Sequence, residues 1–468
     1  MKTEHSNHVV IGAGSGGITV AIGLANLGKR VALIESLHVG GDCTNVGCVP
    51  SKTLIHLAKK YRPGDDVNQV LAEVTRKRNQ LRDKETTEMQ HYPNIDFIQG
   101  HARFNNPKEL EVTVPDGDKR LISADYIVIA TGARPRLLDI PGLPEERTLT
   151  NESLFDISQL PRHLVIMGAG IIAVEMAFAF QKLGSRVTLI ALDEHVLPTY
   201  PPEVAEAMQP ELEKRGINVH LKATSDHYEE ESKTLFARRQ DELFPIQDVD
   251  QVLIAIGRVR NIDQLDLEKA GIAYDRNGIQ VDGFGRTNVK GVYAIGDVTP
   301  TSAFTHSANA QGRRVVQKIL FSYLPASKKE PLFPTSTYSD PEIATVGLTR
   351  KQIEEKCHPN LIMHLRFDLK DLDRGYTDDI QNGFILVDVV SLTGTILGAT
   401  IVAPHASEMI SFFTLAINQR ISMYKLYRQV YPYPTFSNGI QKIADAFMRE
   451  TLPNMLREIK TYLRYRIS

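Results

Sequence analysis

Two cysteines, Cys43 and Cys48, are the residues of this sequence best suited to chemistry. They lie in the segment GGDCTNVGCVPSK, which spans residues 40–52 and leads into an apolar-periodic stretch. The one other cysteine, Cys357, lies in EEKCH and is expected to be an incidental surface thiol. A structural disulfide framework normally needs more cysteines in a shorter, secreted chain. In a reducing compartment, so close a pair favours redox catalysis or metal binding.

Two copies of one pattern predict two nucleotide-binding units. Each copy has an apolar strand, a glycine-rich turn, a helix and a second apolar strand, which is the full context of a Rossmann unit. The turns read GAGSGG from residue 12 and GAGIIA from residue 168. We therefore expect two dinucleotide sites. The alternative is that one copy is only a tight strand–helix turn.

The residues of these turns have distinct expected roles. Gly12 would make the tight turn, Gly14 would let a pyrophosphate approach the backbone, and Gly17 would let the helix pack closely on the strand. Glu35, at the end of the second strand, could accept hydrogen bonds from a ribose. The corresponding turn residues of the second copy are Gly168, Gly170 and Ala173.

The motifs follow one another in an order that resembles the class I flavin disulfide reductases over nearly the whole chain. These include glutathione reductase, dihydrolipoamide dehydrogenase and mercuric reductase, and the match to GGxCxNxGCxPSK is very specific. The resemblance implies an α/β fold with two Rossmann-like dinucleotide-binding domains and a C-terminal α+β dimerisation domain, assembled as a homodimer. FAD would occupy the first domain, and NADH or NADPH the second. The expected limits are 1–147 and 273–333 for the FAD domain, 148–272 for the NAD(P)H domain, and 334–468 for the dimerisation domain with its basic tail.

The resemblance also implies roles at the redox centre. Cys48 would face the flavin and Cys43 would attack the substrate, so that the pair converts flavin chemistry into thiol exchange. A helix beginning near Pro50 would place its positive end beside Cys48 and favour a thiolate. Lys52 would lie near flavin N5 with Glu175 as its partner, and would stabilise negative charge on the reduced ring.

Further cofactor contacts are implied by the same resemblance. Asp297, in the segment AIGD, would hydrogen-bond the ribityl chain, and Ala102 would contact the adenine end. Short apolar strands that each stop at a small residue supply the remaining expected positions, which are Thr131, Gly132 and Gly257.

The C-terminal part departs from the family pattern at the position of proton transfer. In the disulfide reductases the partner subunit supplies His-Pro-Thr-x-x-Glu, whose histidine and glutamate shuttle protons to and from the thiols. The matching segment here is YPTFSN, in which Tyr433 replaces the histidine and Asn438 the glutamate. A tyrosine ordinarily titrates near ~10 and an asparagine does not titrate, so we expect the usual proton shuttle to be missing.

Mercuric reductases also carry a tyrosine at this position, because a soft metal ion bound between thiolates needs no general base for a leaving thiol. The chain lacks the further C-terminal cysteine pair that passes mercury inward. The resemblance is therefore closest to mercuric-reductase-like oxidoreductases of unassigned substrate. Tyr433 is the residue that we expect at the catalytic position.

The segment after the second strand of the second copy should select the nicotinamide. An acid there would bind a ribose 2′-hydroxyl, and an arginine would bind a 2′-phosphate. Ala191 and Leu192 occupy the usual positions, and Asp193 and Glu194 follow them. Because a 2′-phosphate would lack a charge partner among these residues, we favour NADH.

Composition and charge exclude several classes of function. The formal net charge of -2 gives no overall attraction to nucleic acid or anionic lipid. The first apolar strand begins at residue 8, which leaves no room for a secretory signal, and no run reaches the ~18 apolar residues of a membrane span. We expect a cytoplasmic protein that binds no nucleic acid.

The C-terminal tail alternates apolar residues at helical spacing with basic residues. These are Leu452, Met455, Leu456, Ile459 and Leu463, with Arg457, Lys460, Arg464 and Arg466 between them. A basic amphipathic segment can rest on a membrane surface. Packing against the dimer is the interpretation that the sequence favours.

Three functions stay open. The leading one is an NAD(P)H-dependent reductase that uses FAD and the cysteine pair on a disulfide, a soft metal ion or another small thiol-reactive acceptor. The second is a flavin quinone reductase or transhydrogenase with vestigial cysteines, against which the retention of both cysteines argues. The third is a redox sensor or structural dimer that binds FAD without turnover, suggested by the missing dyad. We assign no resident metal site.

Overall fold

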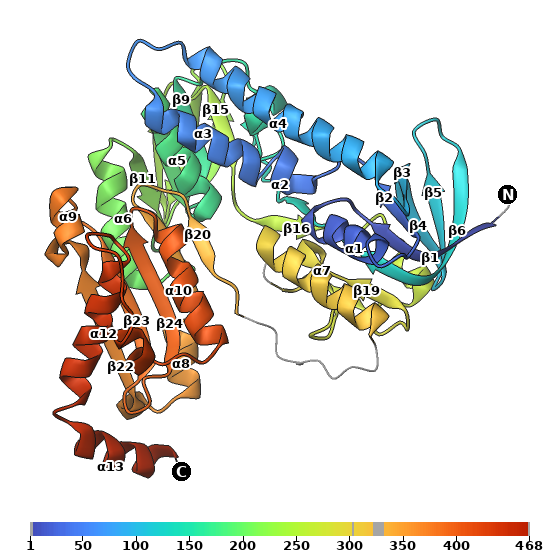
Figure 1. The fold of residues 1–468 in the computed structure, drawn as a ribbon. Coiled ribbons are helices and arrows are strands. Elements are labelled where there is room, and N and C mark those ends of the chain that lie inside the picture. The colour runs from blue at the N-terminus through green and yellow to red at the C-terminus, as the bar shows by residue number, and fades with distance from the viewer. Residues whose placement is uncertain (1–2, 302–303, 322–331, 467–468) are drawn as a thin grey trace.

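The computed structural model describes residues 3–301, 304–321 and 332–466. Most of these residues belong to three units, each built on one large sheet, and Figure 1 shows the three units. The first sheet is mixed, because antiparallel pairs extend its parallel strands, whereas the second sheet is parallel and the third is antiparallel. This arrangement confirms the predicted α/β class with a separate C-terminal α+β unit. The predicted domain limits stay predictions.

The first sheet has seven strands in the order β3-β2-β1-β6-β5-β4, with β19 added beside β6. Its central strands carry apolar runs because both faces are buried, one against helices and the other against antiparallel strands and the segment 262–281. The strands are β1 (Thr3–Ile11), β2 (Val31–Glu35), β3 (Ile95–Gln99), β4 (His101–Asn106), β5 (Glu109–Thr113), β6 (Lys119–Ile129) and β19 (Val292–Ala294). Helices α1 (Ser15–Ala25) and α7 (Thr305–Leu320) pack on each other beside this sheet.

The second sheet has five strands in the order β11-β10-β9-β15-β8. They are β8 (Thr148–Leu149), β9 (His163–Met167), β10 (Arg186–Ala191), β11 (Asn218–Leu221) and β15 (Gln251–Ile254), with helices α5 (Ile171–Leu183) and α6 (Pro202–Lys214). All five residues of β9 are buried, as expected for a central parallel strand. Smaller sheets adjoin these units: β12 (Thr224–Glu229), β13 (Thr234–Arg239) and β14 (Glu242–Ile246); β7 (Ala133–Pro135) with β16 (Arg258–Arg260); and β17 (Tyr274–Asp275) with β18 (Gly278–Ile279).

The third unit is a five-stranded sheet in the order β20-β21-β24-β23-β22, with helices packed on it. The strands are β20 (Thr335–Thr337), β21 (Glu342–Gly347), β22 (Ile362–Asp368), β23 (Phe384–Val390) and β24 (Ile396–Ala403). The helices are α8 (Arg350–Lys356), α9 (Asp373–Thr377), α10 (Ala406–Asn418), α11 (Met423–Tyr427), α12 (Asn438–Thr451) and α13 (Met455–Arg466). The helical spacing noted in the tail corresponds to α13.

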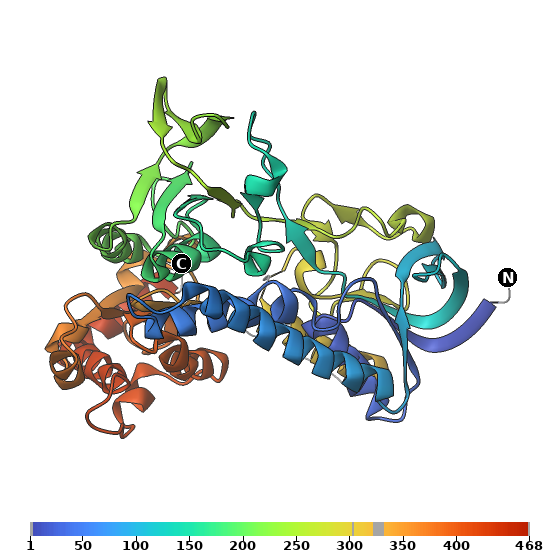
Figure 2. The same cartoon turned by 90° about the horizontal axis from the view of Figure 1, so that it is seen from above.

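Helices α2 (Gly41–Asn45), α3 (Cys48–Lys60) and α4 (Val67–His91) connect the three units. In Figure 2 the blue helices run from the side of the green second unit to the first sheet, and α3 packs on α5. Leu54 of α3 and Leu71 of α4 share one hydrophobic cluster with Phe178 of α5 and Phe384 of β23. This shared core fixes the start of α3, and with it the cysteine pair, against both other units.

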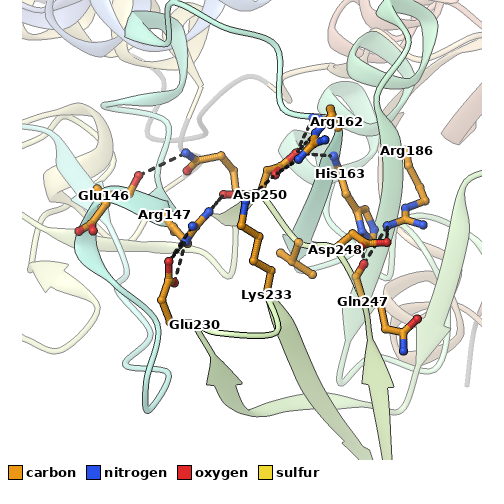
Figure 3. Close-up of polar contacts among 12 residues, drawn as sticks. Glu146, Arg147, Arg162, His163, Arg186, Glu230, Lys233, Gln247, Asp248 and Asp250 are labelled. Atoms are coloured by element: carbon orange, nitrogen blue, oxygen red, sulfur yellow. Dashed lines mark hydrogen bonds and ion pairs between the residues drawn. The ribbon is translucent and has the colours of Figure 1, made fainter.

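A polar network closes the second sheet at the end opposite its glycine turn (Figure 3). The Asp250 carboxylate accepts the backbone N–H of Arg162 at 2.9 Å and of His163 at 3.3 Å. The His163 ring bonds the Gln247 carbonyl through Nδ1 and the Thr188 hydroxyl through Nε2, both at 2.9 Å. Nδ1 donates to the carbonyl, and the Thr188 hydroxyl can donate to Nε2 of the neutral ring.

This network predicts a pH-dependent stability. Burial lowers the pKa of His163, and hydrogen bonds from Arg162 lower the pKa of Asp250 although burial opposes them. Both groups bind fewer protons when folded, so stability is complete above the unfolded pKa values and falls as the pH falls. Between about pH 7 and 5 the histidine contributes up to about 1.4 kcal/mol per pH unit.

We expect the thermal midpoint to fall over this range, and to fall less steeply in His163→Gln, which starts lower at neutral pH because it loses both ring bonds. The measurement is thermal unfolding across the range, with His91→Gln on exposed α4 as the matched control. Equal slopes in His163→Gln and the parent would contradict this assignment.

Candidate active site

The cysteine pair lies where two helices begin. Cys43 is in the single-turn helix α2, and Cys48 is the first residue of α3, two positions earlier than the start expected near Pro50. Asn45 anchors the turn between them by donating from Nδ2 to the carbonyls of Val39 at 3.0 Å and Gly41 at 2.8 Å. Both cysteines are free thiols, and Cys48 is the more exposed.

The surroundings shift the pKa values of the two sulfurs in opposite directions. A hydrogen bond from the Cys43 thiol, against the opposing effect of burial, lowers the pKa of Cys48 to about 6. Thr305, whose hydroxyl lies 3.4 Å from the Cys48 sulfur, and the Lys52 ammonium lower it further. The same bond and burial raise the pKa of Cys43. At neutral pH the reduced pair therefore holds a thiolate at Cys48 and a thiol at Cys43.

Lys52 and Glu175 are brought together from different units. Lys52, one turn into α3, donates from Nζ to both Glu175 oxygens, at 2.8 and 3.1 Å. Glu175 lies in α5 and is only 3% exposed. Tyr338, after β20, donates its backbone N–H to Glu175 at 2.9 Å and places its ring 4.6 Å from Nζ. The second and third units thus hold the Lys52 cation near the Cys48 sulfur of α3.

The first glycine turn has the shape that a dinucleotide needs. At Gly12 (φ +102) a Cβ would lie 2.4 Å from the Ala130 oxygen, and at Gly17 it would lie 1.8 Å from the Gly12 oxygen. At Gly14 a Cβ would meet only the Gly41 Cα, at 3.8 Å. The turn therefore requires its outer glycines for packing and leaves open space at the middle one, which fits an approaching pyrophosphate.

Glu35 lies at the end of β2 beside this turn. Its Oε2 accepts the Ala13 N–H at 2.6 Å and its Oε1 the Leu37 N–H at 2.7 Å, so the carboxylate is fixed with lone pairs remaining for a ribose. Burial raises its pKa. The second turn repeats the geometry, because a Cβ at Gly168 (φ +123) would lie 2.5 Å from the Ala255 oxygen while Gly170 faces open space.

The other predicted cofactor residues are distributed around the first sheet. Ala102 is buried on β4, so any contact with adenine falls to its backbone. Thr131 exchanges hydrogen bonds of 2.9 Å with Asn261, and Gly132 follows it with φ +70. Gly257 (φ +112) follows β15 and faces open space.

Asp297 has an ionic neighbour that the sequence did not indicate. Its carboxylate lies 3.7 Å from Arg258 Nε, and the same guanidinium bonds Asp42, next to Cys43. Burial raises the pKa of Asp297. Within the described residues the buried Nε of Arg258 has no hydrogen-bond partner. The glycine cradle, the Glu35 carboxylate and this incompletely bonded donor together fit an extended polar cofactor such as FAD.

Tyr433 and Asn438 lie in the third unit, near the start of α12. Tyr433 is 70% exposed, and an interaction with the Asp373 carboxylate raises the pKa of its hydroxyl. Asn438 is buried and donates to Gln441 at 3.0 Å. Neither contacts the cysteines of its own chain within the described residues, and α12 begins apart from α2 in Figure 1.

Several residues at the site were not predicted from the sequence. Thr305 and Tyr338 belong to no motif, and Asp373 is one acid among many in its segment, so no spacing indicated them. Thr44 beside Cys43 donates to Glu85 of α4 at 2.9 Å, which ties the redox turn to the long helix. The one signal in the sequence for Arg258 was its position directly after Gly257, at the end of a short apolar strand.

An open cavity of about 430 Å³ lies against the exposed face of α3. Its lining residues are Cys48, Val49, Lys52, Thr53, His56 and Lys77. The thiolate-forming sulfur therefore reaches a space large enough for a small molecule, among basic side chains and with no carboxylate in the lining.

Comparison with known proteins now identifies the family. The model of the pyridine nucleotide-disulphide oxidoreductases matches residues 6–312, and that of their dimerisation domain matches residues 333–444. The chain belongs to this family. It is 31% identical to mercuric reductase from Lysinibacillus sphaericus over 96% of this chain and 84% of the relative. It is 30% identical to dihydrolipoyl dehydrogenase from Chlorobaculum tepidum over 93% of this chain and 95% of the relative.

A solved structure gives the same result. The Cu(II) complex of the HOCl-induced flavoprotein disulfide reductase RclA from Escherichia coli matches with a TM-score of 0.86 and 28% identity, covering 95% of this chain and 99% of that one. The protein is therefore an FAD-dependent oxidoreductase with NAD(P)H as electron donor, and its dimerisation domain supports a homodimer.

Replacing Cys48 tests the asymmetry of the pair. We expect Cys48→Ser to keep FAD, because the glycine turn and Glu35 form that site independently, and to lose the long-wavelength thiolate–flavin absorbance band on anaerobic reduction. Reduction of artificial dyes should survive, since it needs only reduced flavin, while turnover of thiol-reactive acceptors should fall by about 10² or more. Cys357→Ser is the control. Unchanged acceptor turnover in Cys48→Ser would remove the pair from the mechanism.

Proposed function

We propose that the enzyme passes electrons from NADH through FAD to Cys43 and Cys48 and on to a small thiol-reactive acceptor, a soft metal ion in preference to an alkyl disulfide. FAD supplies hydride acceptance from the nicotinamide and electron-pair transfer to sulfur. In this proposal Cys48 faces the flavin, Cys43 meets the acceptor, and Lys52, held by Glu175, stabilises negative charge on the reduced ring.

The preference for a metal rests on the two residues that occupy the proton-transfer position. The Tyr433 hydroxyl is held by Asp373 with a raised pKa, and Asn438 cannot titrate. Expelling an alkyl thiolate benefits from a general acid that titrates near neutral pH, whereas binding a soft ion to sulfur does not need one. One relative is named for mercury reduction and one solved structure is a Cu(II) complex. That structure is also named a disulfide reductase and another relative a dihydrolipoyl dehydrogenase, so the preference rests on the residues of this chain.

The preference for NADH depends on charges beside β10. Asp193 and Glu194 follow the strand, and Glu194 is paired with Lys222 at 2.7 Å. Lys222 is therefore engaged, and a 2′-phosphate would meet carboxylates. We place the enzyme in the cytoplasm as part of the same proposal, because a working dithiol must be kept reducible.

The direct test is a steady-state screen of acceptors with both nicotinamides. We expect NADH to give the higher kcat/KM, and soft metal ions presented as thiolate complexes to outperform lipoamide and glutathione disulfide. A disulfide turned over with a kcat on the order of 10² per second would contradict the preference for a metal.

Restoring the missing dyad should improve disulfide turnover. We expect Tyr433→His with Asn438→Glu to raise it at least several-fold, because a positioned imidazole acid contributes about 10² to 10⁴ in rate. Tyr433→His alone should retain part of the gain, since Asp373 already lies beside that position. Dye reduction, FAD content and the thermal midpoint are the controls. No gain in a fully folded double variant would mean that another acid does this work.

A further inference from the structure

Helix α13 is attached to the third unit through one face. The Tyr465 ring stacks on His358 with centroids 3.8 Å apart and an interplanar angle of 18°. Glu458, on the same face, is 7% exposed. In Figure 1 the helix lies at the end of the unit farthest from the second sheet. Its orientation is therefore set by contacts within this chain.

The opposite face of α13 is apolar and faces solvent. Leu456 is 77% exposed, Leu463 is 56% exposed and Ile459 is 38% exposed, and their spacing of three and four residues makes one stripe. Leu452, in the turn just before the helix, is also 54% exposed. Exposed leucines scattered singly are ordinary, but a continuous stripe on an anchored helix indicates a contact surface.

Basic residues border this stripe. Lys460 is exposed at its edge, Arg464 is exposed one turn further on with its guanidinium 5.5 Å from the centre of the Tyr465 ring, and Arg457 is 71% exposed. Glu458, the single acid of α13, is buried and bonded to Arg457 at 3.1 Å. The solvent face of the helix thus combines leucines and cations without a carboxylate.

We propose that this face binds an anionic phospholipid surface, with the leucine stripe in the headgroup region and the cations on lipid phosphates. The charge complementarity is that of helices lying in a membrane interface. Among the described residues no helix is long and apolar enough to cross a membrane, so the contact is peripheral.

A second copy of the chain fits this face less well. The dimerisation model ends at residue 444, before α13. A separate set of exposed apolar residues lies within the matched region: Phe412, Leu415, Tyr427, Val430 and Tyr433. An antiparallel two-fold contact through α13 would also bring the edge that carries Lys460 and Arg464 against the same edge of the other copy. These arguments reverse the preference drawn from the sequence, in which the tail packs against the dimer.

The test is sedimentation of the full-length, FAD-loaded protein with vesicles. We expect binding to phosphatidylcholine vesicles that contain about one third phosphatidylglycerol, weaker binding at high salt, and at least tenfold weaker binding to pure phosphatidylcholine. Lys460→Glu with Arg464→Glu should weaken binding to anionic vesicles at least tenfold, since each cation contributes about fivefold. Leu456→Ser with Leu463→Ser should weaken it similarly.

Matched controls separate the surface from net charge and assembly. Lys29→Glu with Lys290→Glu makes the same charge change at exposed sites of the first unit and should leave binding unchanged within about twofold. Light scattering should give the same molar mass for all variants. Absence of binding to anionic vesicles, equal weakening by the control pair, or dissociation of the dimer in the leucine variant would each overturn the proposal.

Discussion

The Glu175 carboxylate is the point on which the three units of this protein converge. It projects from α5 of the second unit, accepts both bonds from Lys52 of α3, and accepts the backbone N–H of Tyr338 from the third unit. A buried carboxylate without partners would be costly, and removing one partner of such a pair typically costs about 3–5 kcal/mol. The units must therefore meet in one geometry for this group to be satisfied. The position of the Lys52 cation beside Cys48 follows from that geometry.

The chemistry of the cysteine pair follows from the same arrangement. Because α3 is fixed at Lys52, its first residue, Cys48, stays next to Thr305 at the start of α7 and within the field of the Lys52 cation. The hydrogen bond between the two cysteines lowers the pKa of Cys48 and raises that of Cys43, so that one sulfur is a thiolate and the other retains its proton. Such a pair suits electron transfer at the charged sulfur and thiol exchange at the protonated one. The folded site therefore determines which sulfur is charged before any acceptor binds.

The sequence was sufficient for the parts of the site that depend on local backbone geometry. Gly12 and Gly17 leave no room for a side chain, and the strand–turn–helix pattern that requires them is visible in one dimension. The start of α3 was placed two residues late, because helix ends depend on caps that propensity describes poorly. The contacts of Tyr338, Thr305 and Asp373 could not be predicted, since each is made by a common residue type brought in from a distant segment. The missing dyad was visible only because the family pattern gave an expectation to depart from.

The central claim is that Cys43 and Cys48 form a working dithiol coupled to the flavin, and anaerobic titration of the wild-type enzyme with NADH tests it most directly. We expect uptake of about two NADH equivalents per FAD, one for the disulfide and one for the flavin, with a long-wavelength thiolate–flavin band at its maximum after the first. Full bleaching of the flavin by a single equivalent, with no such band, would contradict the account.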